Sequence, residues 1–217
     1  MLGFTVASAT KPLRRVLVVG CHSDDVEIGC GGTILALTRA HPGVEITWVV
    51  LSAAEARAEE ATASAEAFAA AAGSLDLRVH GFSDAFLPYD GEAVKEAFES
   101  LKPIDPDLVL THTRFDLHQD HRLACELTWN TFRDHLILEY EIPKYDGDLG
   151  TPNVFVSLDD DLVDEKLRLL REHHPSQGGK HWFDDELFRG LLRLRGMESA
   201  TRYAEAFTCR KLSLVLA

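Results

Sequence analysis

Two short segments of this chain are dense in histidine and aspartate. They are residues 21–25, with the sequence CHSDD, and residues 112–121, with the sequence HTRFDLHQDH. Imidazole nitrogens and carboxylate oxygens suit zinc, and a catalytic zinc keeps three protein ligands and one open position for water. We predict that His22, Asp25 and His121 form such a His₂Asp set.

Neighbouring residues supply the other groups that a hydrolytic site needs. Asp24, the spare carboxylate, is predicted to be the general base beside the metal-activated water. His118 is expected to act as an imidazolium that stabilises an oxyanion or protonates a leaving amine. Asp120 has two equal interpretations, a cap for the helix that begins there or a partner that orients a histidine. His112 is expected to be a strand-end histidine rather than a ligand.

A simpler interpretation exists for the Asp-Asp pair, because aspartate after a strand is usually a turn or cap residue. The adjacent His22 and the second acidic-histidine segment favour a functional site instead. The two segments must then meet in space, which depends on the elements that carry them.

Hydrophobic patterning predicts strands alternating with helices, and therefore a mostly parallel sheet covered on both faces. The predicted strands are 15–20, 44–52, 75–82, 107–112, 136–142 and 154–158, with a last strand or packed tail at 211–217. The predicted helices are 33–40, 54–73, 92–101, 120–134, one ending at 172, and a long one over 184–206. Active sites of such sheets lie at the carboxyl ends of the strands, which is where both acidic-histidine segments fall.

Composition limits the possible partners and locations. The chain has 217 residues and a net charge of −13, which makes it a poor partner for nucleic acid or an anionic membrane surface. No apolar run approaches the roughly 18 to 20 residues of a transmembrane helix, and the N-terminus lacks the order of a secretory signal. We therefore expect a cytoplasmic protein with a single domain over 1–217. The four cysteines form no C-x-x-C pair.

Other common motifs are missing or incomplete. The GCGG of residues 29–32 is not a G-x-G-x-x-G dinucleotide fingerprint, and the chain has neither a P-loop nor a G-x-S-x-G elbow. The run DLHQDH at 116–121 is close to the H-x-H-x-D-H of metallo-β-lactamases, which would mean a β-sandwich and two zinc ions. The alternating strands and helices argue against that alternative. A non-catalytic metal- or ligand-binding accessory protein is a further alternative.

Together, HSDD followed by GCGG and the later THTRFDLHQDHR resemble the PIG-L (LmbE-like) zinc-dependent N-deacetylases. The YAEAF of residues 203–207 is similar to that family's C-terminal pattern. The resemblance implies a Rossmann-like three-layer αβα fold and hydrolysis of an N-acetyl group, usually on an amino sugar. It implies His22, Asp25 and His121 as metal ligands.

The same resemblance implies Asp24 as the base, His118 as the group that polarises the carbonyl, and Arg57 as a substrate-binding residue. The chain departs from the family's P-H-P-D-D-E at three positions, with Cys21 and Ser23 for the prolines and Val26 for the glutamate.

The sequence leaves three questions open. Zn²⁺ is the expected ion, but a His₂Asp site also accepts Fe²⁺, Co²⁺ or Mn²⁺. The substrate is expected to be a small N-acetylated amino sugar or its conjugate, and the type of conjugate is open. A homo-oligomer is compatible with the long C-terminal helix.

Overall fold

The computed structural model describes residues 3, 5–6 and 12–213. A seven-stranded sheet forms its centre, with strand order β3-β2-β1-β4-β5-β7-β6. The strands are β1 (Arg15–His22), β2 (Glu45–Ser52), β3 (Ser74–Val79), β4 (Leu108–His112), β5 (Ile137–Tyr140), β6 (Val154–Leu158) and β7 (Tyr203–Thr208). The first five strands pair in parallel, whereas β7 runs antiparallel to both β5 and β6. The predicted Rossmann-like α/β class is confirmed.

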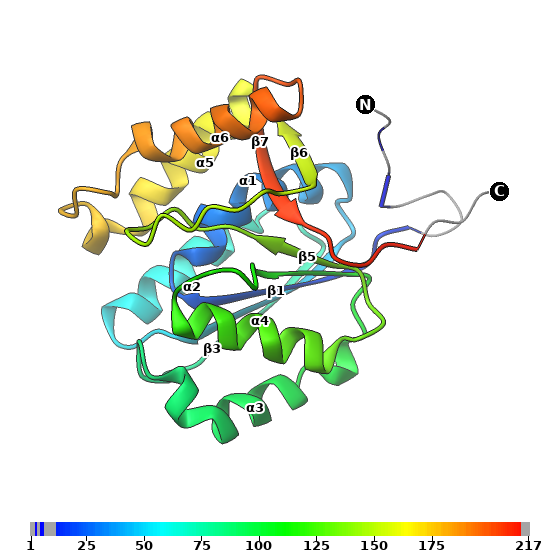
Figure 1. Cartoon of the computed structure of the whole chain (residues 1–217), viewed down its shortest axis with the longest axis vertical. Coiled ribbons are helices and arrows are strands. Elements are labelled where there is room, and N and C mark those ends of the chain that lie inside the picture. Colours follow the sequence, from blue (N-terminus) through cyan, green and yellow to red (C-terminus); the bar gives the residue numbers. More distant parts are fainter. Residues whose placement is uncertain (1–2, 4, 7–11, 214–217) are drawn as a thin grey trace.

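Helices cover both faces of the sheet (Figure 1). They are α1 (Asp25–Ala40), α2 (Ala56–Phe68), α3 (Gly91–Glu99), α4 (Gln119–Thr131), α5 (Asp160–His173) and α6 (Asp185–Glu198), with short 3₁₀ turns at Leu87–Asp90, Lys102–Ile104 and Pro175–Gln177. Helices α1, α2 and α5 pack against one another on one face of the sheet. Helices α3 and α4 pack against each other on the opposite face. The β-sandwich of the metallo-β-lactamase alternative is therefore wrong.

The alternation of side chains along β1 explains how one strand serves two cores. Val16 and Val18 belong to the hydrophobic cluster beneath α1, α2 and α5, while Leu17 and Val19 belong to the cluster beneath α3 and α4. Successive side chains of a strand point to opposite faces, so a continuous apolar run is buried on both sides. Strand β1 is therefore held between the two clusters, and its last residues lie at the carboxyl edge of the sheet.

The sequence-based element limits are wrong near the C-terminus. The pattern of residues 184–206 predicts one helix, but α6 ends at Glu198 and Tyr203–Thr208 is strand β7. Ala200, with a φ of 61°, lies in the connection between them. Tertiary pairing overrides the helix propensity of YAEAF, because this segment fills the position between β5 and β6. In the predicted last strand, residues 211–213 are not in a strand, and 214–217 lie outside the described residues.

Helix α1 is longer than predicted and is broken at Cys30, where φ is −146°. The buried ion pair of Lys166 and Glu205 makes hydrogen bonds to the backbone on both sides of this break. Glu205 of β7 accepts hydrogen bonds from the N–H groups of Gly32 and Thr33, at 2.8 and 2.6 Å. Lys166 of α5 donates to the Ile28 carbonyl oxygen at 2.7 Å and to Glu205 at 2.6 Å. This pair takes over hydrogen bonding that an unbroken helix supplies from its own backbone.

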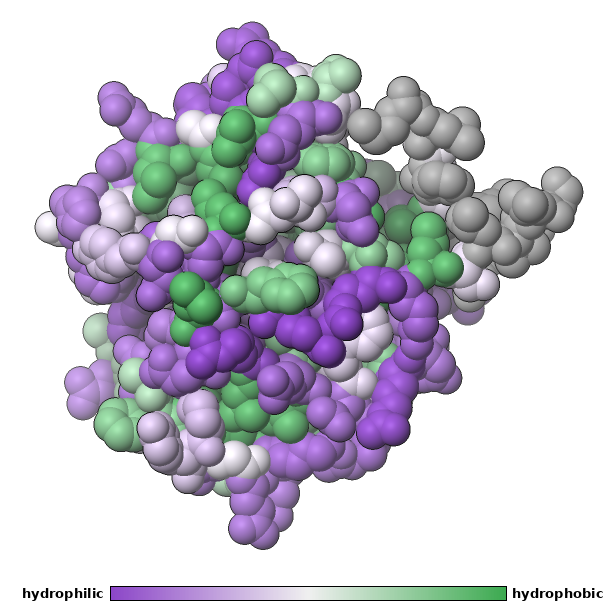
Figure 2. Space-filling model, viewed as in Figure 1, coloured by the Kyte–Doolittle hydropathy of each residue, from purple (hydrophilic) through white to green (hydrophobic). Residues whose placement is uncertain are grey.

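Hydrophilic side chains cover most of the face seen in Figure 2, and apolar ones lie among them in small groups. This surface agrees with the strongly acidic composition. Within the described part of the chain, no helix has the length and apolarity to cross a membrane.

Candidate active site

A cleft of about 980 Å³ lies at the carboxyl edge of the sheet. Its lining includes residues from the loops after β1 and β4, which carry the two acidic-histidine segments. Because β1 and β4 are neighbouring parallel strands, both segments end at the same edge. The sheet order thus brings together residues about one hundred positions apart in the chain, such as His22 and His121, whose ring nitrogens approach to 3.2 Å.

Three donor atoms in this cleft form a nearly equilateral triangle. His22 Nδ1 lies 3.2 Å from Asp25 Oδ2 and 3.2 Å from His121 Nε2, and the last two atoms are 3.3 Å apart. Ligand atoms at about 2.0–2.1 Å from a tetrahedral zinc are separated by roughly 3.3 Å. The predicted set of His22, Asp25 and His121 therefore fits a divalent cation in its donor chemistry and its spacing.

The far nitrogen of His121 is held by a carboxylate. His121 Nδ1 lies 2.9 Å from Asp116 Oδ2, and the Asp116 side chain is fully buried. Lys144 Nζ contacts the same oxygen at 2.8 Å. Burial disfavours the Asp116 carboxylate, but His121, His112 and Lys144 outweigh burial and hold the pKa of Asp116 well below its usual value. The ionised Asp116 accepts a hydrogen bond from the Nδ1–H of His121, which leaves a lone pair on Nε2 for a metal.

Two carboxylates face the far nitrogen of His22. Its Nε2 lies 3.0 Å from Asp84 Oδ1 and 3.5 Å from Asp120 Oδ2. Asp120 also accepts hydrogen bonds from the N–H groups of Ala85 and Leu87, so it fixes the loop before the 3₁₀ turn at Leu87–Asp90. It does not cap α4, whose N-cap residue is His118. Of its two sequence interpretations, the structure supports a partner of a histidine.

The surroundings of the triangle favour the protonated form of its two histidines and the ionised form of Asp25. Burial disfavours charged histidine, but Asp25 and neighbouring carboxylates outweigh it and raise the pKa of both His22 and His121. Burial also opposes the Asp25 anion, yet His121, His22 and His112 hold the pKa of Asp25 well below its usual value. A cation in the triangle takes the place of these protons, which is the usual linkage between metal binding and protonation.

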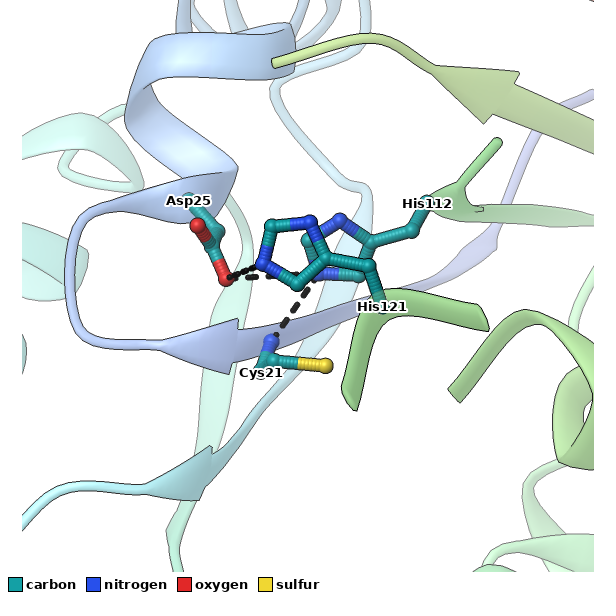
Figure 3. A group of neighbouring side chains, drawn as sticks. All are labelled: Cys21, Asp25, His112 and His121. Carbon is teal, nitrogen blue, oxygen red and sulfur yellow. Dashed lines mark hydrogen bonds and ion pairs between the residues drawn. The ribbon is translucent and has the colours of Figure 1, made fainter. Parts of the chain in front are cut away.

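Figure 3 shows a second group of donors around Asp25, formed with Cys21, His112 and His121. The rings of His112 and His121 stack with centroids 3.9 Å apart. His112 Nε2 accepts a hydrogen bond from the Cys21 N–H at 3.0 Å and lies 3.3 Å from Asp25 Oδ2. Burial and the charge of His121 lower the pKa of His112 to about 4, so the ring is neutral. His112 ends β4 as predicted, but the sequence did not indicate that it packs on His121, one of the predicted ligands.

Asp24 lies immediately before α1, yet its side chain makes no capping hydrogen bond. The cap interpretation therefore does not account for this residue. Asp24 is 6 % exposed, and its Oδ1 lies 3.1 Å from Arg57 Nη2. Arg57 Nη1 in turn donates to Glu60 at 2.6 Å and to the Ser176 hydroxyl at 3.1 Å. Arg57 is thus held in the cleft against the predicted base, rather than being a surface residue of α2.

His118 differs from the expectation that it acts as an imidazolium. Its Nδ1 accepts a hydrogen bond from the N–H of Asp120 at 3.2 Å, which leaves the ring proton on Nε2. Burial and the charges of His121 and His22 lower the pKa of His118. The ring in this cleft is therefore a neutral N–H donor.

The glycines of GCGG allow close packing around the second turn of α1. A Cβ atom on Gly29 would lie 2.2 Å from the Tyr140 ring, and one on Gly31 would lie 2.6 Å from the Phe68 ring. These contacts account for a glycine-rich segment that is not a nucleotide-binding fingerprint.

The loops around the cleft contribute further residues, of which the sequence did not single out Asp84 or Lys144. Asp84 follows β3, Lys144 follows β5, and His181 follows α5. The acidic-histidine segment contained one usable signal, because Asp116 lies five positions before His121. Nothing comparable marks Asp84 or Lys144, which reach the site from loops distant in sequence. His174, in contrast, lies buried outside the cleft lining, with Nε2 3.1 Å from the Ser64 hydroxyl.

Comparisons with known proteins agree with this architecture. The family described as GlcNAc-PI de-N-acetylase (PIG-L) matches residues 17–132, more than half of the chain. The chain is 29% identical to diacetylchitobiose deacetylase of Thermococcus kodakarensis, covering 94% of this chain and 86% of that protein. It is 26% identical to the uncharacterized deacetylase YaiS of Escherichia coli, covering 80% and 97%.

Solved structures show the same fold. The N,N′-diacetylchitobiose deacetylase of Pyrococcus horikoshii is 24% identical, with a TM-score of 0.75 and coverage of 95% and 87%. The 4-carboxy-2-hydroxymuconate hydratase GalB of Pseudomonas putida has the same TM-score at 19% identity, covering 94% and 100%. One fold thus carries two reactions, so the reaction has to be argued from the site.

The chain belongs to the PIG-L family of deacetylases, a class of amide-hydrolysing enzymes.

Proposed function

We propose that this chain is a zinc-dependent N-deacetylase that hydrolyses the acetamide of an N-acetylglucosaminyl-type conjugate. The observation that carries the proposal is the triangle of His22, Asp25 and His121 in one cleft with Asp24 and His118. The named activities of the two chitobiose deacetylases support the same reaction.

The triangle would hold the cation, with Asp116 and Asp120 orienting its two histidines. When bound, zinc supplies a Lewis acid for the acetyl carbonyl and lowers the pKa of water. Asp24 takes a proton from the attacking water, while Arg57 holds the Asp24 carboxylate in position.

The proton and bond balance of the reaction is simple. The water oxygen bonds to the carbonyl carbon, and the His118 Nε2–H donates a hydrogen bond to the developing oxyanion. The C–N bond then breaks and Asp24 returns its proton to the amine nitrogen. The products are the free amino sugar and acetic acid, which ionises to acetate and a proton at neutral pH.

Acetate release by the zinc-loaded protein tests the proposal, with a panel of N-acetylated amino sugars and conjugates as substrates. We expect about one zinc per chain in the unmodified protein and in Asp24→Asn, and a turnover lower by roughly 10² to 10⁴ in that variant. Asp25→Ala should lose the metal itself.

Two results would contradict the proposal. Full zinc content in Asp25→Ala would remove this residue from the ligand set. Zinc bound without acetate release from any member of the panel would favour a non-catalytic, metal-binding protein.

A further inference from the structure

The cleft has two parts of different character. The largely buried side chains of His22, Asp24, Asp25 and His121 form its floor. Four large side chains that line the same cavity form what we call the outer wall: Tyr145, Leu149, Trp182 and Leu187. They come from the loop after β5, from the segment that joins α5 to α6, and from the first turn of α6.

The outer wall leaves apolar surface open to the cleft. Tyr145 is 77% exposed, Leu149 40% and Leu187 36%. Single exposed apolar residues are ordinary on a protein surface, but apolar residues that gather at one concave site mark a place where a ligand or partner binds. These three residues line the same cavity as the triangle of His22, Asp25 and His121. This shared cavity favours a small-molecule ligand over a protein partner.

Contacts between these segments give the wall a defined form. The Tyr145 hydroxyl and His181 Nδ1 lie 3.3 Å apart, and the two rings have centroids 5.4 Å apart. Lys180 Nζ lies 5.5 Å from the centre of the Trp182 ring. Lys144 ties the loop to Asp116 below, as described above. The wall is therefore built on the same network that orients His121.

The size of the cleft indicates a substrate with two parts. A volume of about 980 Å³ is at the upper end of the range for ligand sites, roughly 300–1,000 Å³. An N-acetylated sugar whose acetamide reaches the floor fills only the inner part. The outer part then faces the side chains of two leucines and the rings of Tyr145 and Trp182, which present mostly apolar surface, and the Tyr145 hydroxyl has His181 as one partner.

We propose that the outer wall is a subsite for an apolar aglycone, so that the preferred substrate is an N-acetylglucosaminide carrying an alkyl chain. This inference rests on the proposed deacetylase function and narrows its substrate class. The floor binds the polar sugar, and the outer wall takes the chain out of water.

A series of β-glycosides of N-acetylglucosamine tests the subsite. The aglycones are methyl, butyl and octyl, with diacetylchitobiose as the carbohydrate counterpart, all at concentrations below micelle formation. Each methylene group buried on binding contributes up to about a fourfold factor, so kcat/KM for the octyl glycoside should exceed that for the methyl glycoside by roughly tenfold or more. Diacetylchitobiose should fall below the octyl glycoside.

Matched variants locate the effect. Leu187→Ser and Leu149→Ser should reduce the octyl-to-methyl ratio to about threefold or less, because each removes apolar surface of the outer wall. Leu194→Ser is the control, since Leu194 is an exposed leucine of the same helix as Leu187 and does not line the cleft. It should keep the ratio of the unmodified protein.

The outcomes separate this inference from the proposed function. Acetate release with an octyl-to-methyl ratio near one, or with diacetylchitobiose preferred, would overturn the subsite and leave the deacetylase standing. An unchanged ratio in Leu187→Ser together with a smaller oligomer in size-exclusion chromatography would mean that the wall is a protein interface. Absence of release from every glycoside by the zinc-loaded protein would instead refute the deacetylase.

Discussion

At position 118, one backbone hydrogen bond decides which ring nitrogen is free for catalysis. The Asp120 N–H occupies His118 Nδ1, so Nε2 carries the proton and is the oxyanion donor of the proposed mechanism. We expect His118→Ala to lower turnover by roughly 10² to 10³, because that is the usual effect of losing one oxyanion donor. Zinc content should stay at the level of the unmodified protein. Turnover within threefold of that protein would remove His118 from the mechanism.

The histidines of the site also predict how the metal-free protein responds to pH. His22 and His121 have raised pKa values, so the stability they contribute is complete below about pH 6.5 and is lost as the pH rises through their folded values. His112 and His118 have lowered pKa values, so unfolding takes up protons at those positions when the pH falls below about 6.5.

From these two pairs we expect the melting temperature of the metal-free protein to be highest near pH 6.5. Zinc should move that optimum upward, because a metal binds the deprotonated histidines. Thermal unfolding from pH 5 to pH 9, with and without zinc, measures both effects. A melting temperature that rises steadily to pH 9 without metal would contradict the linkage.

At the scale of the elements, the buried pair of Lys166 and Glu205 stabilises the break in α1 close to the turn that carries the predicted metal ligands His22 and Asp25. Lys166→Met leaves Glu205 charged and buried without its partner, so we expect a loss of roughly 3–5 kcal/mol in the free energy of unfolding. The double variant Lys166→Met/Glu205→Gln should recover part of this loss, because it buries no unpaired charge. Urea unfolding of the metal-free variants is the measurement, and a loss below about 1 kcal/mol would mean that the pair is dispensable.

The elements also show what local sequence can and cannot predict. Strand β1 was predictable because a short apolar run that ends in glycine is typical of a buried parallel strand, and the two acidic-histidine segments followed from strand ends. Strand β7 was not predictable, since Ala and Glu favour a helix and the pairing partners of this segment are more than forty residues upstream. Asp84 and Lys144 could not be predicted for a related reason: their place in the site depends on where two loops fold back.

At the scale of the molecule, the described residues share one sheet with a hydrophobic cluster on each face. We propose that residues 1–217 form a single domain, and we expect one cooperative unfolding transition. Zinc at one hundred times its dissociation constant should stabilise the protein by about 2.7 kcal/mol. Circular dichroism and tryptophan fluorescence should give coincident curves, since Trp48 lies in the core and Trp182 in the cleft. Separate transitions would contradict the single domain.

The oxygen of Asp116 that contacts both His121 and Lys144 has a thermodynamic consequence. It couples the loop that lines the cleft to a predicted metal ligand, so a compound that restrains the loop changes the affinity for zinc. Such coupling is reciprocal: the factor by which the compound tightens zinc equals the factor by which zinc tightens the compound. The equilibrium affinity for zinc, measured by competition with a chelator, therefore becomes a reporter of what occupies the cleft, even for a compound that is never hydrolysed.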